Sequence, residues 1–296
     1  MPSAANARAY VNITRPQNAS GSVITYFIGF FLATNSISID FFIGLLILLA
    51  LHSLATIQND VEDFEIDQAN KRSSILQSRS ISLADARFFI FALVFAALIF
   101  AFISPHKKLN LIAIAGLMAI AWVYNLQPFR ASKRPVMSIS IMGICYGVLP
   151  FVYGYLLGDG DYRQWYFLAL LPFWFLARFS TAILKDYKDA AGDKKFQKDT
   201  FYLHFGSILT AWTSIVAALV SYFGIIMILT LTLNKNTMFY IFMALAALLA
   251  IKALLLRFSL LETTNEKTLN SIFHKTVFRH NQFEGALLLC LILSSR

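Results

Sequence analysis

The chain has 296 residues, of which 58% are hydrophobic and 14% are charged, and its mean hydropathy is +0.63. Soluble domains carry roughly 25% charged residues, so this composition excludes an ordinary soluble protein and predicts an integral membrane protein. The net charge of +9 is spread among the connections between apolar runs. This pattern argues against nucleic-acid binding and suits a face that meets anionic membrane lipid. No feature of the sequence predicts an oligomeric state.

A polar tail at residues 1–20 precedes apolar runs that are long enough to cross a bilayer as helices, at about 20 residues each. We predict nine transmembrane helices, at 22–39, 41–58, 86–104, 109–126, 136–157, 165–184, 203–232, 237–256 and 277–294. They form a single all-α membrane domain over residues 1–296. Cys145 and Cys290 lie inside apolar runs, where they suit packing and neither a disulfide framework nor a metal site.

Lysine and arginine set the expected orientation, because connections that stay in the cytoplasm carry an excess of basic residues. With the N-terminus inside, the inner segments are the tail and the 2–3, 4–5, 6–7 and 8–9 connections. Most of the 25 Lys and Arg residues fall in these segments. We therefore predict a multi-pass protein with its N-terminus inside and its C-terminus outside.

The first chemical signal is an acidic run at residues 59–67, directly after the second predicted helix. On a helix, Asn59, Asp63 and Asp67 share one face, and Asp60 lies beside that face. Carboxylates beside a membrane core are costly and often mark functional sites. Clustered carboxylates without Cys or His suit a hard cation such as Mg²⁺. Taken alone, the run equally fits a solvated acidic loop.

A second acidic cluster lies in the 6–7 connection and is formed by Asp186, Asp189 and Asp193. Its spacing of three and then four residues repeats that of Asp60, Asp63 and Asp67. Both clusters follow even-numbered helices and therefore lie at the same membrane face. Two facing carboxylate sets repel one another unless cations lie between them. Mg²⁺ typically binds through one or two carboxylates and substrate phosphates. We therefore predict a magnesium–diphosphate site whose metal ligands are Asp60, Asp63, Asp67, Asp186, Asp189 and Asp193.

A third motif, at the end of the fourth predicted helix, places Tyr124 before Arg130 and Lys133. The ring face of a tyrosine can stabilise a cation, so Tyr124 joins Asp60, Asp63, Asp186 and Asp189 as a candidate catalytic residue. The candidate residues for binding the substrate are Asn59, Lys71, Arg72, Arg130, Lys133 and Lys185. Each lysine and arginine of this set also fits a plain anchor of the inner face.

These motifs together resemble the UbiA superfamily of intramembrane prenyltransferases. The family's first motif, N-D-x-x-D-x-x-x-D, is met in full at residues 59–67, and the form K-D-x-x-D-x-x-G-D occurs at 185–193. The usual continuation of the first motif, N-K-P-x-R-P, is absent, because residues 70–75 read N-K-R-S-S-I. Arg72 or Arg79 is left to supply the missing positive charge.

The resemblance implies nine helices around a central cavity with a polar cap of cytoplasmic loops. It also implies Mg²⁺-dependent transfer of a prenyl group from a polyprenyl diphosphate to a small acceptor through an allylic carbocation. We expect an aromatic acceptor. A non-aromatic lipid or sugar phosphate acceptor, or terpene cyclisation of the UbiA type, stays open. The competing class is a cation-coupled transporter, which would place carboxylates deeper in the helices. His52 lies on the same helix face as Asn59 and either orients the acceptor or is structural.

Overall fold

The computed structural model describes residues 4–69, 74–188, 190–196, 198–263 and 265–294, and every regular element in these ranges is a helix. The elements in chain order are α1 (Ala4–Ile13), α2 (Pro16–Ala33), α3 (Ile39–Glu62), α4 (Phe64–Ala69), α5 (Leu83–Ile103), α6 (Lys107–Asn125), η1 (Ala131–Lys133), α7 (Pro135–Gly143), η2 (Ile144–Val148), α8 (Leu149–Leu157), α9 (Trp165–Ala182), η3 (Lys185–Lys188), α10 (Ala190–Lys195), α11 (Phe201–Thr232), α12 (Thr237–Phe258), η4 (Ser259–Glu262) and α13 (Glu266–Ser294).

Seven helical segments in the described part of the chain are long and apolar enough to cross a membrane. They are Ile39–Glu62, Leu83–Ile103, Lys107–Asn125, Pro135–Leu157, Trp165–Tyr187, Phe201–Thr232 and Thr237–Glu262. Each overlaps one of the predicted runs. The first and last predicted runs overlap α2 and α13, which are not among the seven, so the predicted count of nine membrane helices is not confirmed.

The N-terminal residues are more helical than expected, because the predicted polar tail holds α1 and the beginning of α2. Pro16 starts α2, where its missing N–H costs no helical hydrogen bond. Arg15, with a φ of 47°, turns the chain between the two helices. In α1 the buried residues Ala9 and Ile13 are one turn apart on one face. Such a narrow apolar stripe leaves the composition polar, so the segment resembled a tail.

The last helix also begins earlier than expected, at Glu266. Its first half is amphipathic, and the residues buried there at helical spacing are Leu269, Ile272, Thr276 and His280. Exposed lysines on the opposite face lower the hydropathy of this half. The predicted apolar run, 277–294, therefore begins later than the helix does.

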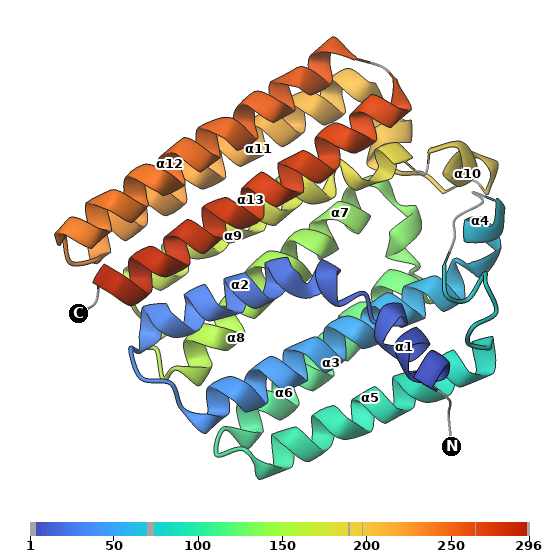
Figure 1. The fold of residues 1–296 in the computed structure, drawn as a ribbon, viewed down its shortest axis with the longest axis horizontal. Helices are drawn as coiled ribbons and strands as arrows, with labels where there is room; N and C mark the ends of the chain where they lie inside the picture. Colours follow the sequence, from blue (N-terminus) through green and yellow to red (C-terminus); the bar gives the residue numbers. More distant parts are fainter. Residues whose placement is uncertain (1–3, 70–73, 189, 197, 264, 295–296) are drawn as a thin grey trace.

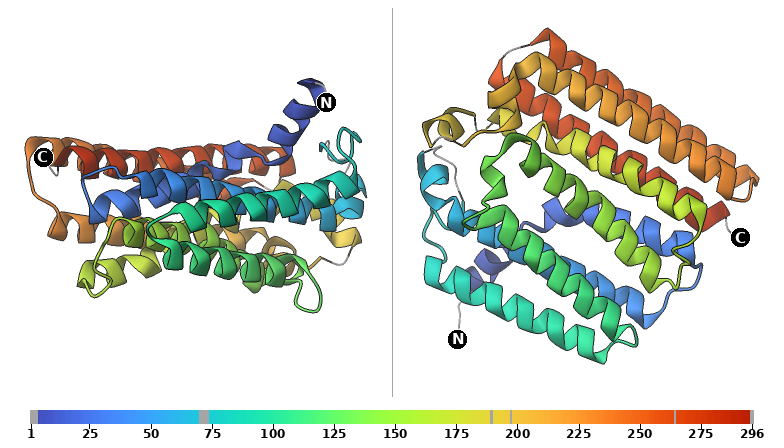
Figure 2. Two further views of the ribbon diagram at one scale, coloured as in Figure 1. Left: turned by 90° about the horizontal axis from the view of Figure 1, so that it is seen from below. Right: turned by 180° about the vertical axis from the view of Figure 1, so that it is seen from behind.

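The helices form a bundle in which α2 and α8 lie between two groups (Figure 1). On one side are α9, α11, α12 and α13, and on the other are α3, α5 and α6. Each group has its own hydrophobic core, and the two cores meet at the central pair. In α8, Phe151 and Tyr155 pack in the core shared with α9, α11, α12 and α13, whereas Tyr153 and Leu157 pack in the core shared with α3, α5 and α6. The short α1 projects from one end of the bundle (Figure 2).

Two glycines bring the backbones of α2 and α8 into direct contact. A Cβ atom at Gly29 would collide with the carbonyl oxygen of Phe151, and one at Gly154 would collide with the carbonyl oxygen of Tyr26. Backbone atoms cannot rotate away as a side chain can. The absence of side chains at these two positions therefore sets how closely the central pair packs.

A histidine bridges two carboxylates at the bundle end opposite α4 and α10. The imidazole of His106 lies 3.2 Å from Asp40 and 3.0 Å from Asp159. Ser104 donates a hydrogen bond of 2.5 Å to Asp40. Burial alone lowers the pKa of His106, but its hydrogen bonds and charge interactions with Asp159 and Asp40 raise it above 6.5 overall. The cluster joins the start of α3 to the ends of α5 and α8.

We predict that Gly154→Ala lowers the thermal unfolding temperature, because overpacking a tight contact typically costs about 1–3 kcal/mol. The matched control is Gly116→Ala in α6, where an added Cβ would meet no atom within 4 Å. The control should leave the unfolding temperature unchanged or raise it slightly, since Ala favours helix over Gly. Equal effects of the two substitutions would contradict the close α2–α8 contact.

We also predict that the unfolding temperature depends on the protonation of His106. Because the folded state raises this pKa, the stabilisation is fully present below pH 6.5 and is lost as the pH rises through the raised value. Melting curves between about pH 6 and pH 9 should show this loss, and His106→Gln should reduce the slope. His204→Gln, which changes an exposed histidine, should keep the wild-type slope; the same slope in both variants would refute the role of His106.

Candidate active site

One face of α3 forms a wall of a cavity of about 440 Å³ in the middle of the bundle. The residues that line it from α3 and its C-terminal cap follow helical spacing and are Leu48, Leu51, His52, Ala55, Thr56, Asn59, Asp60 and the cap residue Asp63. The wall is apolar at its membrane-core end and acidic at its loop end. The helix face inferred from His52, Asn59 and Asp63 is therefore present, and it points into a cavity.

The acidic wall continues beyond the end of α3. The amide of Asp63 donates to the carbonyl of Asn59 at 2.9 Å, and the amide of Asp67 donates to the carbonyl of Asp63 at 2.8 Å. The chain thus keeps a helical course from α3 into α4, and Asp67 lies one turn beyond Asp63. The side chains of Asp60, Asp63 and Asp67 are about 95% buried, with exposed fractions of 4%, 5% and 5%.

The second acidic cluster reaches the same cavity from the other side. Asp186 on η3 and Asp193 on α10 are both buried and line it. Figure 1 shows α10 beside α4 at one end of the bundle, and the two helices are in contact. Asp189 lies outside the described residues. The structure therefore brings together five of the six predicted metal ligands, from segments far apart in the sequence.

Three cations hold the carboxylates. Arg15 pairs with Asp60 at 2.6 Å, and Arg130 lies 3.4 Å from Asp63. Lys198 lies 3.3 Å from Asp63 and 3.6 Å from Asp193, so it links the two clusters. Burial acts to lower the pKa of Lys198, but the charges of Asp63 and Asp193 outweigh it and raise this pKa.

Sequence reasoning did not assign a binding role to Arg15 or Lys198. For Arg15 a signal was present, because an Arg-Pro pair lies a few residues before the first apolar run. Lys198 follows the second acidic cluster by a few residues and looked like one more inner-face anchor. Only the folded chain shows that its ammonium group lies between two carboxylates.

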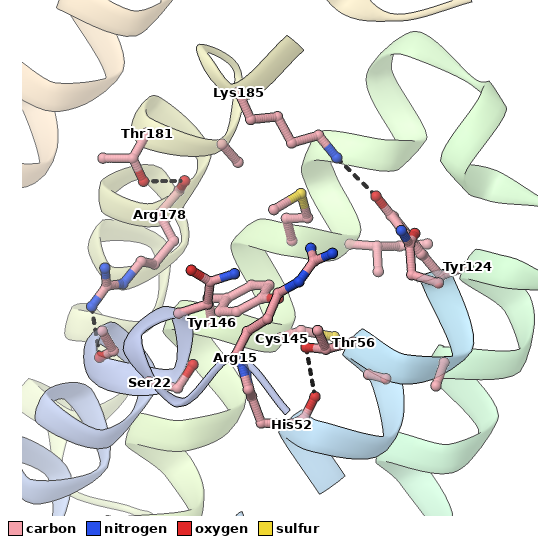
Figure 3. A pocket seen from close by; sticks show the side chains of 18 of the residues that line it. Arg15, Ser22, His52, Thr56, Tyr124, Cys145, Tyr146, Arg178, Thr181 and Lys185 are labelled. Carbon is pink, nitrogen blue, oxygen red and sulfur yellow. Dashed lines mark hydrogen bonds between the residues drawn. The ribbon is translucent and has the colours of Figure 1, made fainter. Parts of the chain in front are cut away.

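Tyr124 and Lys185 line the cavity and point toward one another (Figure 3). Lys185 donates a hydrogen bond of 2.8 Å to the hydroxyl oxygen of Tyr124. Its ammonium group lies 5.5 Å from the ring centroid, which together with the hydrogen bond places it beyond the hydroxyl end of the ring. Lys185 therefore holds the hydroxyl end of Tyr124 and leaves the ring face, which was expected to meet a substrate cation, uncovered by this lysine.

The structure describes two of the four other predicted substrate-binding residues, Arg130 and Lys133. Arg130 donates to the carbonyl of Glu62 at 3.1 Å as well as contacting Asp63, but neither Arg130 nor Lys133 lines the cavity. Burial, followed by the charge of Arg130, lowers the pKa of Lys133. Lys71 and Arg72 lie outside the described residues. Their roles stay predictions.

The part of the cavity wall that α9 contributes contains a further cation. Arg178 on α9 lines the cavity and donates to the carbonyl of Gly21 at 2.7 Å and to the hydroxyl of Thr25 at 3.1 Å. It also forms a buried ion pair with Glu284 on α13. Glu284 was missed because it is a single carboxylate inside a predicted apolar run. The pair leaves Arg178 positioned at the cavity wall and its charge balanced.

The donor set at the loop end of the cavity fits magnesium. Asp60, Asp63, Asp67, Asp186 and Asp193 offer oxygen atoms only, which hard divalent cations prefer. Within the described residues, no three Asp, Glu, His or Cys side chains already converge as a preformed metal site. A diphosphate would supply the missing oxygen ligands and spread its negative charge over metal ions and the neighbouring cations, as is common for Mg²⁺ sites.

Sequence relatives point to one group of enzymes. The chain is 27% identical over 186 residues to digeranylgeranylglyceryl phosphate synthase of Methanoculleus marisnigri, covering 62% of this chain and 64% of that protein. It is 28% identical over 231 residues to the enzyme of the same name from Methanosphaera stadtmanae, covering 75% of this chain and 81% of that one. The chain thus spans a little under two thirds of the first relative and most of the second.

Solved structures share the fold. A UbiA homolog from Archaeoglobus fulgidus bound to DMAPP and Mg²⁺ superimposes with a TM-score of 0.71 at 19% identity, covering 96% of this chain and 99% of that one. The Aeropyrum pernix K1 UbiA homolog, in its apo form, gives a TM-score of 0.64 at 14% identity over 92% of this chain and 96% of that one. At these identities the likeness shows the fold.

The model of the UbiA prenyltransferase family matches residues 22–281. This match and the shared fold confirm the predicted all-α, multi-pass membrane architecture with a central cavity. They also confirm, at the level of the family, that the protein is a prenyltransferase. The chain belongs to the UbiA prenyltransferase family.

Proposed function

We propose that this protein transfers a prenyl group from a prenyl diphosphate to the hydroxyl of a lipid-like glycerol phosphate, with Mg²⁺ bound at the acidic end of its cavity. The observation that carries the proposal is the pair of buried carboxylate clusters that face one cavity and share Lys198. The relatives named digeranylgeranylglyceryl phosphate synthase favour a lipid glycerophosphate acceptor over the aromatic acceptor that we expected from the sequence.

The acidic residues of the two clusters, including Asp189, would hold the metal. Bound Mg²⁺ supplies positive charge to the departing diphosphate. Arg15 and Lys198 already lie against these carboxylates, so their remaining N–H groups are available to donate to diphosphate oxygens at the same place. We assign the same role to Lys71, Arg72, Arg130 and Lys133, and Asn59 adds an uncharged donor.

Bond breaking leaves the electron pair with the diphosphate and an allylic cation on the prenyl group. The ring of Tyr124 offers electron density to that cation, and its orientation is fixed by the hydrogen bond from Lys185. The acceptor oxygen attacks the cation, and its proton leaves with the released diphosphate. The apolar end of the cavity, which Leu48, Leu51 and Ile120 line, excludes water that would otherwise capture the cation.

The positions of the two chain ends and of the basic connections together support one orientation in the membrane. Figure 1 shows α1 at the bundle end that holds α4 and α10, and the C-terminal end of α13 at the opposite end. An odd number of crossings produces this separation. With the basic connections in the cytoplasm, the N-terminus and the metal-binding loops lie inside and the C-terminus outside.

The proposal predicts Mg²⁺-dependent prenyl transfer by the purified protein. Geranylgeranyl diphosphate and geranylgeranylglyceryl phosphate are incubated with the protein, and product lipid and released diphosphate are measured. Asp60→Asn should reduce the rate by about 100-fold or more, the scale of losing a key electrostatic group. The control is Glu65→Gln, which changes an exposed carboxylate of the same segment and should keep the rate.

Each other outcome contradicts a defined part of the proposal. Full activity of Asp60→Asn, or activity without divalent metal, would refute the assignment of the acidic clusters. Transfer to hydroxybenzoate alone would restore the aromatic acceptor, and diphosphate release with a cyclised hydrocarbon product would indicate a terpene cyclase. Cation flux in proteoliposomes without diphosphate release would indicate a transporter.

A second prediction concerns Lys198 in the absence of substrate. Lys198→Met leaves Asp63 and Asp193 facing each other without the shared cation, and losing one partner of a buried charge pair costs several kcal/mol. Because Arg130 still lies near Asp63, we expect a smaller loss, about 1–3 kcal/mol. The unfolding temperature in EDTA should fall, and added Mg²⁺ should raise it more than in the wild type.

The control for this experiment is Lys194→Met, which removes an exposed lysine of α10 and should unfold as the wild type does. If Mg²⁺ shifts the unfolding temperatures of Lys198→Met and the wild type equally, the metal does not bind between the two clusters.

A further inference from the structure

A groove of about 440 Å³ lies between α12 and α13 and shares no lining residue with the active-site cavity. Three cations line it: Lys252 from α12, and Lys275 and Arg279 from α13. Among the described residues that line this groove, none is a carboxylate. The groove is therefore a concentrated positive site on the side of the bundle.

The cations lie some distance inside the helix ends. Lys252 precedes the last residue of α12, Phe258, by six positions, or about 9 Å along the helix axis. The two helices run side by side in opposite directions (Figure 1), which brings Lys275 and Arg279 to the level of Lys252. Charges at this depth meet the boundary of the hydrocarbon core, where unpaired charge is costly.

A neighbouring arginine on the same helix shows how this protein satisfies a membrane charge internally. Arg257 is fully buried and donates to Ser214, Ser180 and Tyr222 at 3.1, 3.1 and 3.3 Å. The groove cations differ, because Lys252 and Lys275 are exposed. Arg279 uses one donor on Gln282 at 2.6 Å. In the described part of the chain, these three cations form no ion pair with a carboxylate.

The surroundings of the groove are apolar. Leu255 and Phe278 line it and are 60% and 59% exposed, and Ser259 adds a hydroxyl at its rim. A ligand that satisfies the whole groove must therefore carry a negative group for the cations and hydrocarbon for the flanking side chains. Free phosphate meets only the first of these requirements.

We propose that the groove between α12 and α13 binds an anionic phospholipid, whose phosphate lies among Lys252, Lys275 and Arg279 and whose acyl chain lies along Leu255 and Phe278. The basic residues of the 8–9 connection place the groove on the inner side in our topology, where anionic lipid attracts cations at the membrane surface. The inference does not depend on which acceptor the active site uses.

The test is native mass spectrometry of the full chain released from detergent micelles that contain either phosphatidylglycerol or phosphatidylcholine. Wild-type protein should retain phosphatidylglycerol in preference to phosphatidylcholine. The triple variant Lys252→Gln, Lys275→Gln, Arg279→Gln should bind phosphatidylglycerol about a hundredfold more weakly, since each of the three cations near the surface contributes on the order of a kcal/mol. The charge-preserving variant Lys252→Arg, Lys275→Arg, Arg279→Lys should bind as the wild type does.

The matched control is Lys107→Gln, Lys108→Gln, which neutralises basic residues at the opposite end of the bundle and should leave binding unchanged. Circular dichroism in phosphatidylcholine establishes whether each variant is folded. If the triple variant does not fold, the single substitution Lys275→Gln, at an exposed position, is measured in its place. Retention of phosphatidylglycerol by the folded neutralised variant would overturn the proposal. The proposal would also be overturned if inorganic phosphate raised the unfolding temperature of the wild type as much as phosphatidylglycerol does, because a lipid would then not be required.

Discussion

The mutual repulsion of buried carboxylates is the constraint on which the active-site end of this protein depends. Five aspartates from two distant segments face one cavity, each with an exposed fraction of 5% or less. Their charges would separate α4 from α10 if nothing lay between them. Lys198 joins the two clusters, and Arg15 closes the site from the chain just before α2. The carboxylates that we propose as metal ligands thus require cations to fold in the absence of metal.

A second polar network holds the opposite half of the bundle together within its apolar core. From Arg178 at the cavity wall it passes through Glu284 to His280, at 3.2 Å, and then to the hydroxyl of Tyr222, at 2.9 Å. Arg257 donates to the same hydroxyl at 3.3 Å and completes the network. Polar groups inside a membrane must find partners within the protein, so these side chains fix how α9, α11, α12 and α13 pack together.

The sequence predicted those parts of the fold and site that depend on local pattern. Apolar runs located the seven long spans, and the repeated aspartate spacing located both halves of the acidic site. The sequence failed where the signal depends on tertiary contact. In α1 and the first half of α13 only a narrow face is apolar, so their polar composition did not indicate buried helices. Lys198 and Glu284 looked like an anchor and an isolated polar residue, because their partners lie 135 and 106 positions away.

The position of the carboxylates along α3 explains why an amphiphilic substrate suits this cavity better than a permeating ion. Asp60 is twelve residues from Leu48, or about 18 Å along the helix, and both residues line the same cavity. An ion crossing the membrane would need polar ligands at the apolar end as well. A molecule with a charged diphosphate and a hydrocarbon chain satisfies both ends at once. The gradient from acidic to apolar residues along one helix face therefore favours a ligand with a charged end and a hydrocarbon end, as the proposed donor substrate has.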